Sequence, residues 1–189
     1  MSNTNDSAGI PRPDGLVLAP FRALRYDPDR VDLARVLAPP YDVIDADGRA
    51  ELEARDPANV VRLTLPTDYA AAGRLLTEWR ESGVLRPDAA PALYVYEEQA
   101  DGHVQRGLVG ALGLTPAEDG IVLPHENTMA GPVADRLALM GAVEADLEPI
   151  FLVYDGGGAA SRLVADAGTP RTSVEFFSPD TAIAYRLQR

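Results

Sequence analysis

The stretch Leu123-Pro-His-Glu-Asn-Thr-Met-Ala-Gly-Pro-Val-Ala-Asp-Arg-Leu137 joins the end of an apolar run to the start of a helical pattern. The run at 121–123 is typical of a short buried strand, which Pro124 ends. Pro132 suits the first helical position because its φ is pre-set and no backbone donor is needed there. Apolar residues then recur at helical spacing and predict a buried face: Val133, Leu137, Met140 and Val143. The stretch is therefore predicted to be a strand-to-helix junction, where α/β proteins hold ligands.

The polar residues of this junction are candidates for a site. His125 and Glu126 could move a proton, and Arg136 could fork onto a carboxylate or a phosphate, so we assign these three residues catalytic roles. Unpaired N–H groups and the dipole at the predicted helix N-terminus favour an anion. We therefore assign substrate binding to the residues around that N-terminus: Thr128, Gly131 and Asp135. In the alternative interpretation, Arg136 pairs with Glu126 or Asp135 and only ties the loop to the helix.

Two other segments add candidate substrate contacts. The prolines of Ala38-Pro-Pro-Tyr-Asp-Val-Ile44 force an extended path, so a stiff segment presents Tyr41 and Asp42. Such a segment can line a pocket, or it can be a rigid connector whose tyrosine simply packs. Residues 59–65 alternate apolar and polar side chains, which predicts a strand carrying Arg62. We expect Tyr41, Asp42, Arg62, His125, Glu126 and Arg136 to line one cleft.

The remaining patterns indicate an α+β fold. Helices are predicted at Ala46–Arg55, Asp68–Ser82 and Pro132–Val143, with Trp79 in the core, and a short helix at 159–167. Asp101-Gly102 should turn a hairpin between a strand near 93–96 and its return at 106–114. Together with the runs at 59–65 and 149–154, these strands predict a mixed sheet covered by three or four helices. Strand patterns also occur at 16–18, 172–177 and 181–187. We expect residues 1–15 to be a disordered leader and residues 16–189 a single domain.

Composition excludes several classes of site. The net charge of −12 argues against a nucleic-acid groove, whose affinity comes largely from neutralising phosphates. The chain has no cysteine, and all 17 basic residues are arginine, so thiol nucleophiles, Cys-ligated zinc, Schiff-base lysines and P-loop lysines are absent. No apolar run approaches the ~20 residues of a membrane span, and the first residues lack a signal-peptide pattern. We expect a cytoplasmic protein that contacts neither membrane nor nucleic acid.

Several strings together resemble a prokaryotic family catalogued as domain of unknown function 1015. They agree in order and spacing from about residue 16 to residue 155: Pro20-Phe-Arg-Ala-Leu-Arg-Tyr-Asp-Pro28, Ala38-Pro-Pro-Tyr-Asp-Val-Ile44, Asn59-Val-Val-Arg-Leu-Thr-Leu-Pro66, Gly83-Val-Leu85, Pro91-Ala-Leu-Tyr-Val-Tyr-Glu97, Leu123-Pro-His-Glu126, Gly131-Pro132, Asp135-Arg-Leu137 and Pro149-Ile-Phe151. The resemblance implies that this chain is the N-terminal half of a protein about twice as long. It also implies a later Asp-Gly-His-His-Arg-Tyr string, similar to one in partition-protein-B-like folds that bind nucleotide phosphates. Asp101-Gly-His103 is not that string, because Val104 and Gln105 follow it.

The resemblance leads to a ranked expectation of function. The leading hypothesis is a phosphotransferase-like enzyme acting on a small anionic metabolite, with a nucleotide, and a divalent cation if one is needed, implied by the resemblance alone. Arg22, Arg62 and Arg136 could then neutralise charge in phosphoryl transfer. A non-catalytic ligand-binding or regulatory module is the first alternative.

A metal-dependent hydrolase or phosphatase is the second alternative, in which His125, Glu126 and Asp135 could ligate a divalent ion. No tight i, i+3 or i+4 ligand pair supports a metal, so we assign no metal ligand. The strand pattern at 181–187 runs almost to the last residue, which suggests an unpaired strand edge through which the chain could self-associate.

Overall fold

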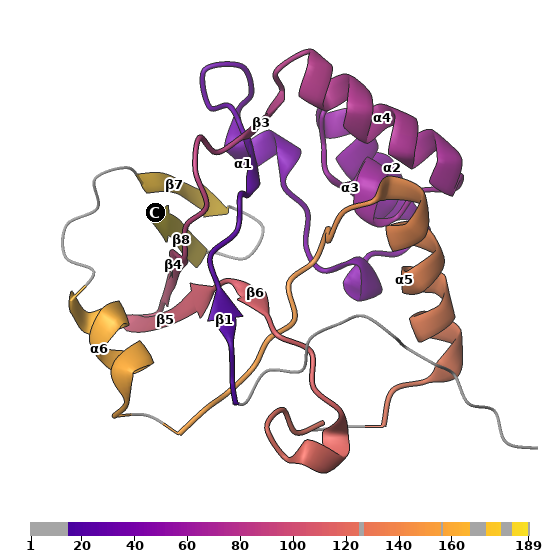
Figure 1. The fold of residues 1–189 in the computed structure, drawn as a ribbon. Coiled ribbons are helices and arrows are strands. Elements are labelled where there is room, and N and C mark those ends of the chain that lie inside the picture. The colour runs from indigo at the N-terminus through magenta and orange to yellow at the C-terminus, as the bar shows by residue number, and fades with distance from the viewer. Residues whose placement is uncertain (1–14, 125–126, 156, 167–172, 179–182, 189) are drawn as a thin grey trace, which may run out of the picture.

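The computed structural model describes residues 15–124, 127–155, 157–166, 173–178 and 183–188 (Figure 1). The helices in these ranges are α1 (Leu33–Val36), η1 (Tyr41–Val43), α2 (Ala46–Arg55), α3 (Val61–Thr64), α4 (Tyr69–Glu81), η2 (Ala117–Asp119), α5 (Ala130–Val143) and α6 (Ala159–Asp166). The strands are β1 (Leu18–Ala19), β2 (Leu24–Tyr26), β3 (Leu85–Pro87), β4 (Tyr94–Ala100), β5 (His103–Val109), β6 (Ala111–Leu112), β7 (Ser173–Ser178) and β8 (Ile183–Gln188). The α+β class is confirmed, and the predicted leader lies almost wholly outside the described residues.

The helical layer is built on α4 and α5, which lie side by side in Figure 1. Asp68 caps α4 by accepting a hydrogen bond from the Ala71 N–H at 3.1 Å, and Gly83, at φ 75°, follows its end. Trp79 is buried on α4, as predicted. At Gly73 a Cβ atom would lie 2.4 Å from the Ala142 carbonyl oxygen of α5. A residue without a side chain is therefore what lets these two helices approach so closely.

Helix α5 begins at Ala130, two residues before the predicted start at Pro132, and it presents a different face to the core from the predicted one. Val133, Leu137 and Met140 are exposed, whereas Leu139 and Val143 are buried. The predicted apolar face was therefore wrong at three of its four positions. The close contact with α4 sets the rotation of α5, and the periodicity of an almost wholly apolar helix could not choose between its faces.

The main sheet has the strand order β5-β4-β8-β7, and each pairing is antiparallel. The predicted hairpin is confirmed: Asp101 and Gly102 both have positive φ, as a tight two-residue turn between β4 and β5 requires. Strand β8 pairs with β4 on one side and with β7 on the other, so it is not the edge strand that its sequence position suggested. Two-stranded pairings of β1 with β6 and of β2 with β3 complete the β structure.

The strand predicted at 59–65 is wrong, because this segment forms the short helix α3. The side-chain oxygen of Asn59 accepts a hydrogen bond from the Val61 N–H at 3.0 Å, which turns the chain. Its amide nitrogen donates to the carbonyl oxygens of Arg35 and Leu37 at 2.7 and 3.2 Å. Asn59 is fully buried, so these contacts outweigh the short alternation of apolar and polar residues that favoured a strand.

The strands predicted at 121–123 and 149–154 are also wrong, since both segments are irregular. The run Pro149–Tyr154 has no strand partner among the described residues, and its apolar side chains are 42–85% exposed from Ile150 to Tyr154. The expected mixed sheet is therefore replaced by antiparallel strands that exclude both runs. In the described part of the chain, no helix combines the length and apolar character needed to cross a bilayer.

Candidate functional site

Arg136 is the centre of a polar cluster at the first turns of α5. Its Nη1 donates to the Thr64 carbonyl oxygen at 2.7 Å, and its Nε and Nη2 lie 3.0 and 2.6 Å from Asp135 Oδ2. Glu148 Oε2 lies 3.5 Å from Nη1, and the guanidinium carbon lies 4.0 Å from the centre of the Tyr41 ring. One arginine thus joins α5, the end of α3, η1 and the loop that follows α5.

Asp135 extends the cluster to α4. The Tyr69 hydroxyl donates a hydrogen bond to Asp135 Oδ1. That bond raises the pKa of Tyr69, and together with the bond from Arg136 it lowers the pKa of Asp135. The carboxylate of Asp135 is therefore held in its charged form by two neighbours, one on each helix.

The pKa of Glu148 is shifted in the direction opposite to that of Asp135. Burial raises its pKa, the nearby charge of Arg136 and the Tyr41 backbone N–H oppose that rise, and the charge of Asp42 adds to it. The pKa of Arg136 is raised: burial favours its neutral form, but Asp135, Glu148 and Tyr41 together outweigh burial. With two carboxylates, Asp135 and Glu148, paired to one guanidinium, the side chains alone do not favour an anion here.

The N-terminus of α5 has the features expected of an anion site. Met129 occupies the N-cap position and supplies no side-chain hydrogen bond, and the first turn contains no acidic residue. The N–H groups of Ala130 and Gly131 have no intrahelical acceptor because they precede the first i−4 carbonyl. Thr128, two residues before the helix start, and Gly131 itself are both exposed. His125 and Glu126 lie outside the described residues.

The structure brings together only part of the predicted cleft. Tyr41 contacts Arg136, and Asp42 is close enough to influence Glu148. Arg62 instead donates from Nη2 to the Glu53 carbonyl oxygen of α2 at 2.7 Å. Arg22, another proposed cation, donates to the Asp88 carbonyl oxygen at 2.8 Å. Both of these arginines bind backbone within the fold.

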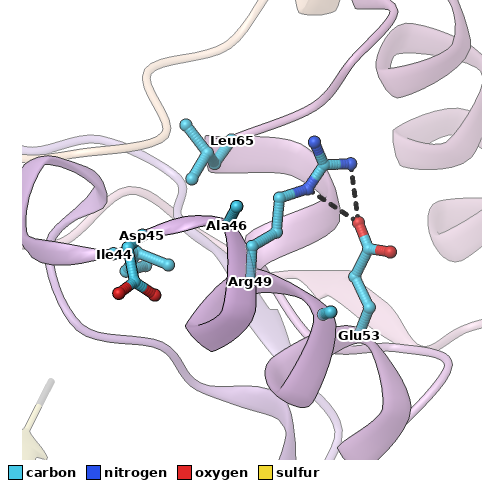
Figure 2. A pocket seen from close by; sticks show the side chains of 7 residues that line it. Ile44, Asp45, Ala46, Arg49, Glu53 and Leu65 are labelled. Atoms are coloured by element: carbon cyan, nitrogen blue, oxygen red, sulfur yellow. Dashed lines mark hydrogen bonds and ion pairs between the residues drawn. The ribbon is translucent and has the colours of Figure 1, made fainter.

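A separate groove of about 390 Å³ lies along α2 and does not include any predicted site residue. It is lined by Ile44, Asp45, Ala46, Arg49, Ala50, Glu53 and Leu65. Figure 2 shows that the cation at this groove is already paired, because Arg49 donates to Glu53 Oε1 at 2.9 and 2.7 Å. Asp45, also in the lining, caps α2 by accepting from the Gly48 N–H. The groove therefore offers an anion no unpaired guanidinium.

Three members of the Arg136 cluster were not predicted from the sequence: Thr64, Tyr69 and Glu148. Tyr69 is 66 residues from its partner Asp135, and Glu148 follows α5 in a segment noted only for its apolar run. For Tyr69, the available signal was the neighbouring Asp68. Asp68 caps α4 and so makes Tyr69 the first residue of that helix. Within the described ranges, no three histidine or acidic side chains gather as a metal site would require.

Comparisons with known proteins identify the family. A family model described as "Protein of unknown function (DUF1015)" matches residues 18–183. No curated protein and no solved structure matches the chain.

Proposed function

The chain belongs to this family, whose description gives no activity, and we propose that it forms the anion-binding part of a phosphotransferase-like enzyme acting on a small anionic metabolite. The observation that carries the proposal is the start of α5, an exposed helix N-terminus with no side-chain cap and no acidic residue in its first turn. Such an end carries a partial positive charge of roughly half a unit and presents free N–H donors to an anion.

Arg136 has a positioning role in this proposal. Its contacts with Thr64, Asp135 and Glu148 hold the first turns of α5 against α3 and the following loop. The guanidinium is thus occupied within the protein, and in this proposal the anion is bound by the backbone N–H groups of Ala130 and Gly131, with Thr128, exposed just before the helix, as a further candidate contact. We expect an affinity for inorganic phosphate on the order of millimolar, because no unpaired cation adds to the dipole.

The phosphoryl donor in this proposal is a nucleotide with a divalent cation, and both follow only from the family resemblance. Phosphoryl transfer requires mainly positioning and charge neutralisation, so a rigid N–H cradle is a useful component of such a site. His125 and Glu126 precede this cradle in the sequence and are the proposed proton-transfer residues. The cytoplasm is the proposed compartment.

A non-catalytic ligand-binding or regulatory module is the second candidate. It is favoured by the internal pairing of Arg136, since an enzyme site usually keeps a charged group available to the reacting atoms. The two candidates share the anion site and differ in turnover. Phosphorus NMR of a nucleotide mixed with the protein and small acids separates them. An enzyme should release or transfer phosphate from the nucleotide, and a non-catalytic module should not.

The anion site is tested with substitutions at the N-cap position. Met129→Asp supplies a capping carboxylate, so it should stabilise the fold by about 0.5–1 kcal/mol while weakening phosphate binding at least tenfold. Met129→Ala is the matched control, because it shortens the same side chain without adding a cap, and it should leave the affinity unchanged. The measurement is a phosphate titration followed through the amide resonances of Ala130 and Gly131. Equal affinities for the Asp and Ala variants would contradict the proposal.

A further inference from the structure

An apolar cavity of about 310 Å³ separates the helical layer from the main sheet. Its walls come from both, with Leu63 of α3 and Leu76 of α4 on one side and Tyr96 of β4 and Leu187 of β8 on the other. The register pairs Tyr96 with Leu187, so these two residues occupy adjacent positions on the sheet face that bounds the cavity. The remaining lining residues are Leu24, Arg25, Tyr26, Leu33, Leu37, Val60, Leu85, Ala145, Asp146 and Leu147.

The size of this cavity sets it apart from ordinary packing defects. Protein interiors contain few voids larger than a water molecule. An enclosed cavity of ~150 Å³ lined by aliphatic residues is enough to bind benzene, and this pocket, which opens to solvent on the side of exposed Asp146, has about twice that volume. The volume lies at the lower end of the ~300–1,000 Å³ range of small-molecule sites. Leu63, Leu76 and Leu85 line this cavity and are at most 6% exposed, so the cavity is bounded by residues of the hydrophobic core.

The polar groups at this cavity decide which head group a ligand can carry. The guanidinium of Arg25 is bound to Asp88, with Nε 3.0 Å from Oδ1, and the Tyr96 hydroxyl donates to Glu98 at 2.9 Å. Asp146 also lines the cavity, is exposed, and has no hydrogen bond or ion pair within the described residues. A carboxylate is therefore the one charged group at the cavity that remains available in this part of the chain.

We propose that this cavity binds a small amphiphilic amine, with its hydrocarbon part among the leucines and its ammonium group at Asp146. The lining favours an apolar body, and the available charge is negative. The net charge of −12 also attracts a cation over long range. This site is distinct from the α5 N-terminus, and the opposite ligand charge makes the two proposals independent.

The head-group preference is measured with three probes that share one hydrocarbon chain: octylamine, octanol and octanoate. Binding is followed through the leucine methyl resonances of the 189-residue chain, including those of Leu24, Leu63 and Leu187. An exposed ion pair corresponds to a preference of roughly two- to fivefold, so octylamine should bind that much more tightly than octanol, with octanoate weakest. Absence of binding by all three probes, or tightest binding of octanoate, would overturn the proposal.

Matched variants assign the preference to one residue. Asp146→Asn should make octylamine and octanol bind equally, whereas Glu144→Gln, which removes the same charge two residues away, should preserve the preference. Equal behaviour of these two variants would overturn the role of Asp146. Leu147→Trp should fill the cavity and weaken all three probes at least tenfold, and Leu33→Phe serves the same purpose from α1 if the first variant does not fold. If either of these two variants folds and still binds the probes unchanged, the probes bind outside the cavity and the proposal is wrong.

Discussion

Helix α5 and the Pro149–Tyr154 run both have apolar sequences, but their surroundings are opposite. At the interface of α5 with α4, Leu139 is 2% exposed and Gly73 brings the two backbones together. In the run, Phe151 is 68% exposed, and no strand among the described residues pairs with it. An apolar sequence therefore indicates a tendency toward burial, while the burial itself depends on a neighbouring element whose shape fits.

The largest expected effect separates the two faces of α5. Leu139→Ala should lower the free energy of unfolding by about 2–5 kcal/mol, because it leaves a cavity against α4. Leu137→Ala removes the same atoms from the exposed face and should change it by less than ~0.5 kcal/mol. Urea unfolding monitored by the fluorescence of Trp79 measures both. Equal losses would mean that α5 is rotated from the orientation described here.

The next effect concerns the close approach of the two helices. Gly73→Ala places a methyl group against the Ala142 carbonyl and should cost about 1–3 kcal/mol by forcing the helices apart. Gly141→Ala makes the same change on α5, where a Cβ atom meets nothing within 4 Å, and should stabilise the fold by about 0.5–1 kcal/mol. The comparison fails if both substitutions change the unfolding free energy in the same direction.

A pH-dependent effect of smaller size arises at the contact between Tyr69 and Asp135. The folded-state pKa of Asp135 is lowered, so its carboxylate stabilises the fold above its unfolded pKa of ~3.9, and this contribution is lost as the pH falls through the folded pKa. Asp135→Asn should therefore be less stable than the parent at pH 7, and the difference should shrink on acidification. Tyr69→Phe removes the main cause of the shift and should weaken this pH dependence. An Asp135→Asn difference that does not vary between pH 2 and pH 7 would contradict the assignment.

The smallest effect is expected in the exposed run. Phe151→Ser should change the free energy of unfolding by less than ~0.5 kcal/mol, since the side chain is mostly in solvent. A buried strand phenylalanine would instead cost about 3–5 kcal/mol on truncation to a small residue. A loss of that size would show that the run is packed in solution and would remove the contrast with the α4–α5 interface.

Elements specified by local signals were predictable from the sequence. Asp45 and Asp68 cap the two predicted helices that follow them, and Asp101-Gly102 turns its hairpin as predicted. Short segments whose structure depends on distant partners were not predictable. Residues 59–65 form a helix because buried Asn59 binds carbonyl groups more than 20 residues away.

The candidate site follows the same division. The sequence drew attention to Arg136 and Tyr41, which do meet, and to a helix start near Gly131 that is proposed to bind an anion. It did not indicate that Thr64, Tyr69 and Glu148 would join the cluster, because these contacts depend on how α3, α4 and the loop after α5 pack. The interpretation of Arg136 as a residue paired with Asp135 agrees with the geometry, and its assignment as a catalytic residue remains a prediction.

The central claim is that the backbone at the start of α5 binds the anion while Arg136 holds that backbone in place. Arg136→Gln tests it when the free energy of unfolding and the phosphate affinity of the folded protein are measured on the same sample. We expect a loss of stability of about 1.5–3 kcal/mol, because charge-assisted bonds to Thr64 and Asp135 are removed. The phosphate dissociation constant should change less than about threefold, since the Ala130 and Gly131 N–H groups remain. Unchanged stability together with a tenfold or greater loss of affinity would contradict the account and make Arg136 the ligand-binding residue.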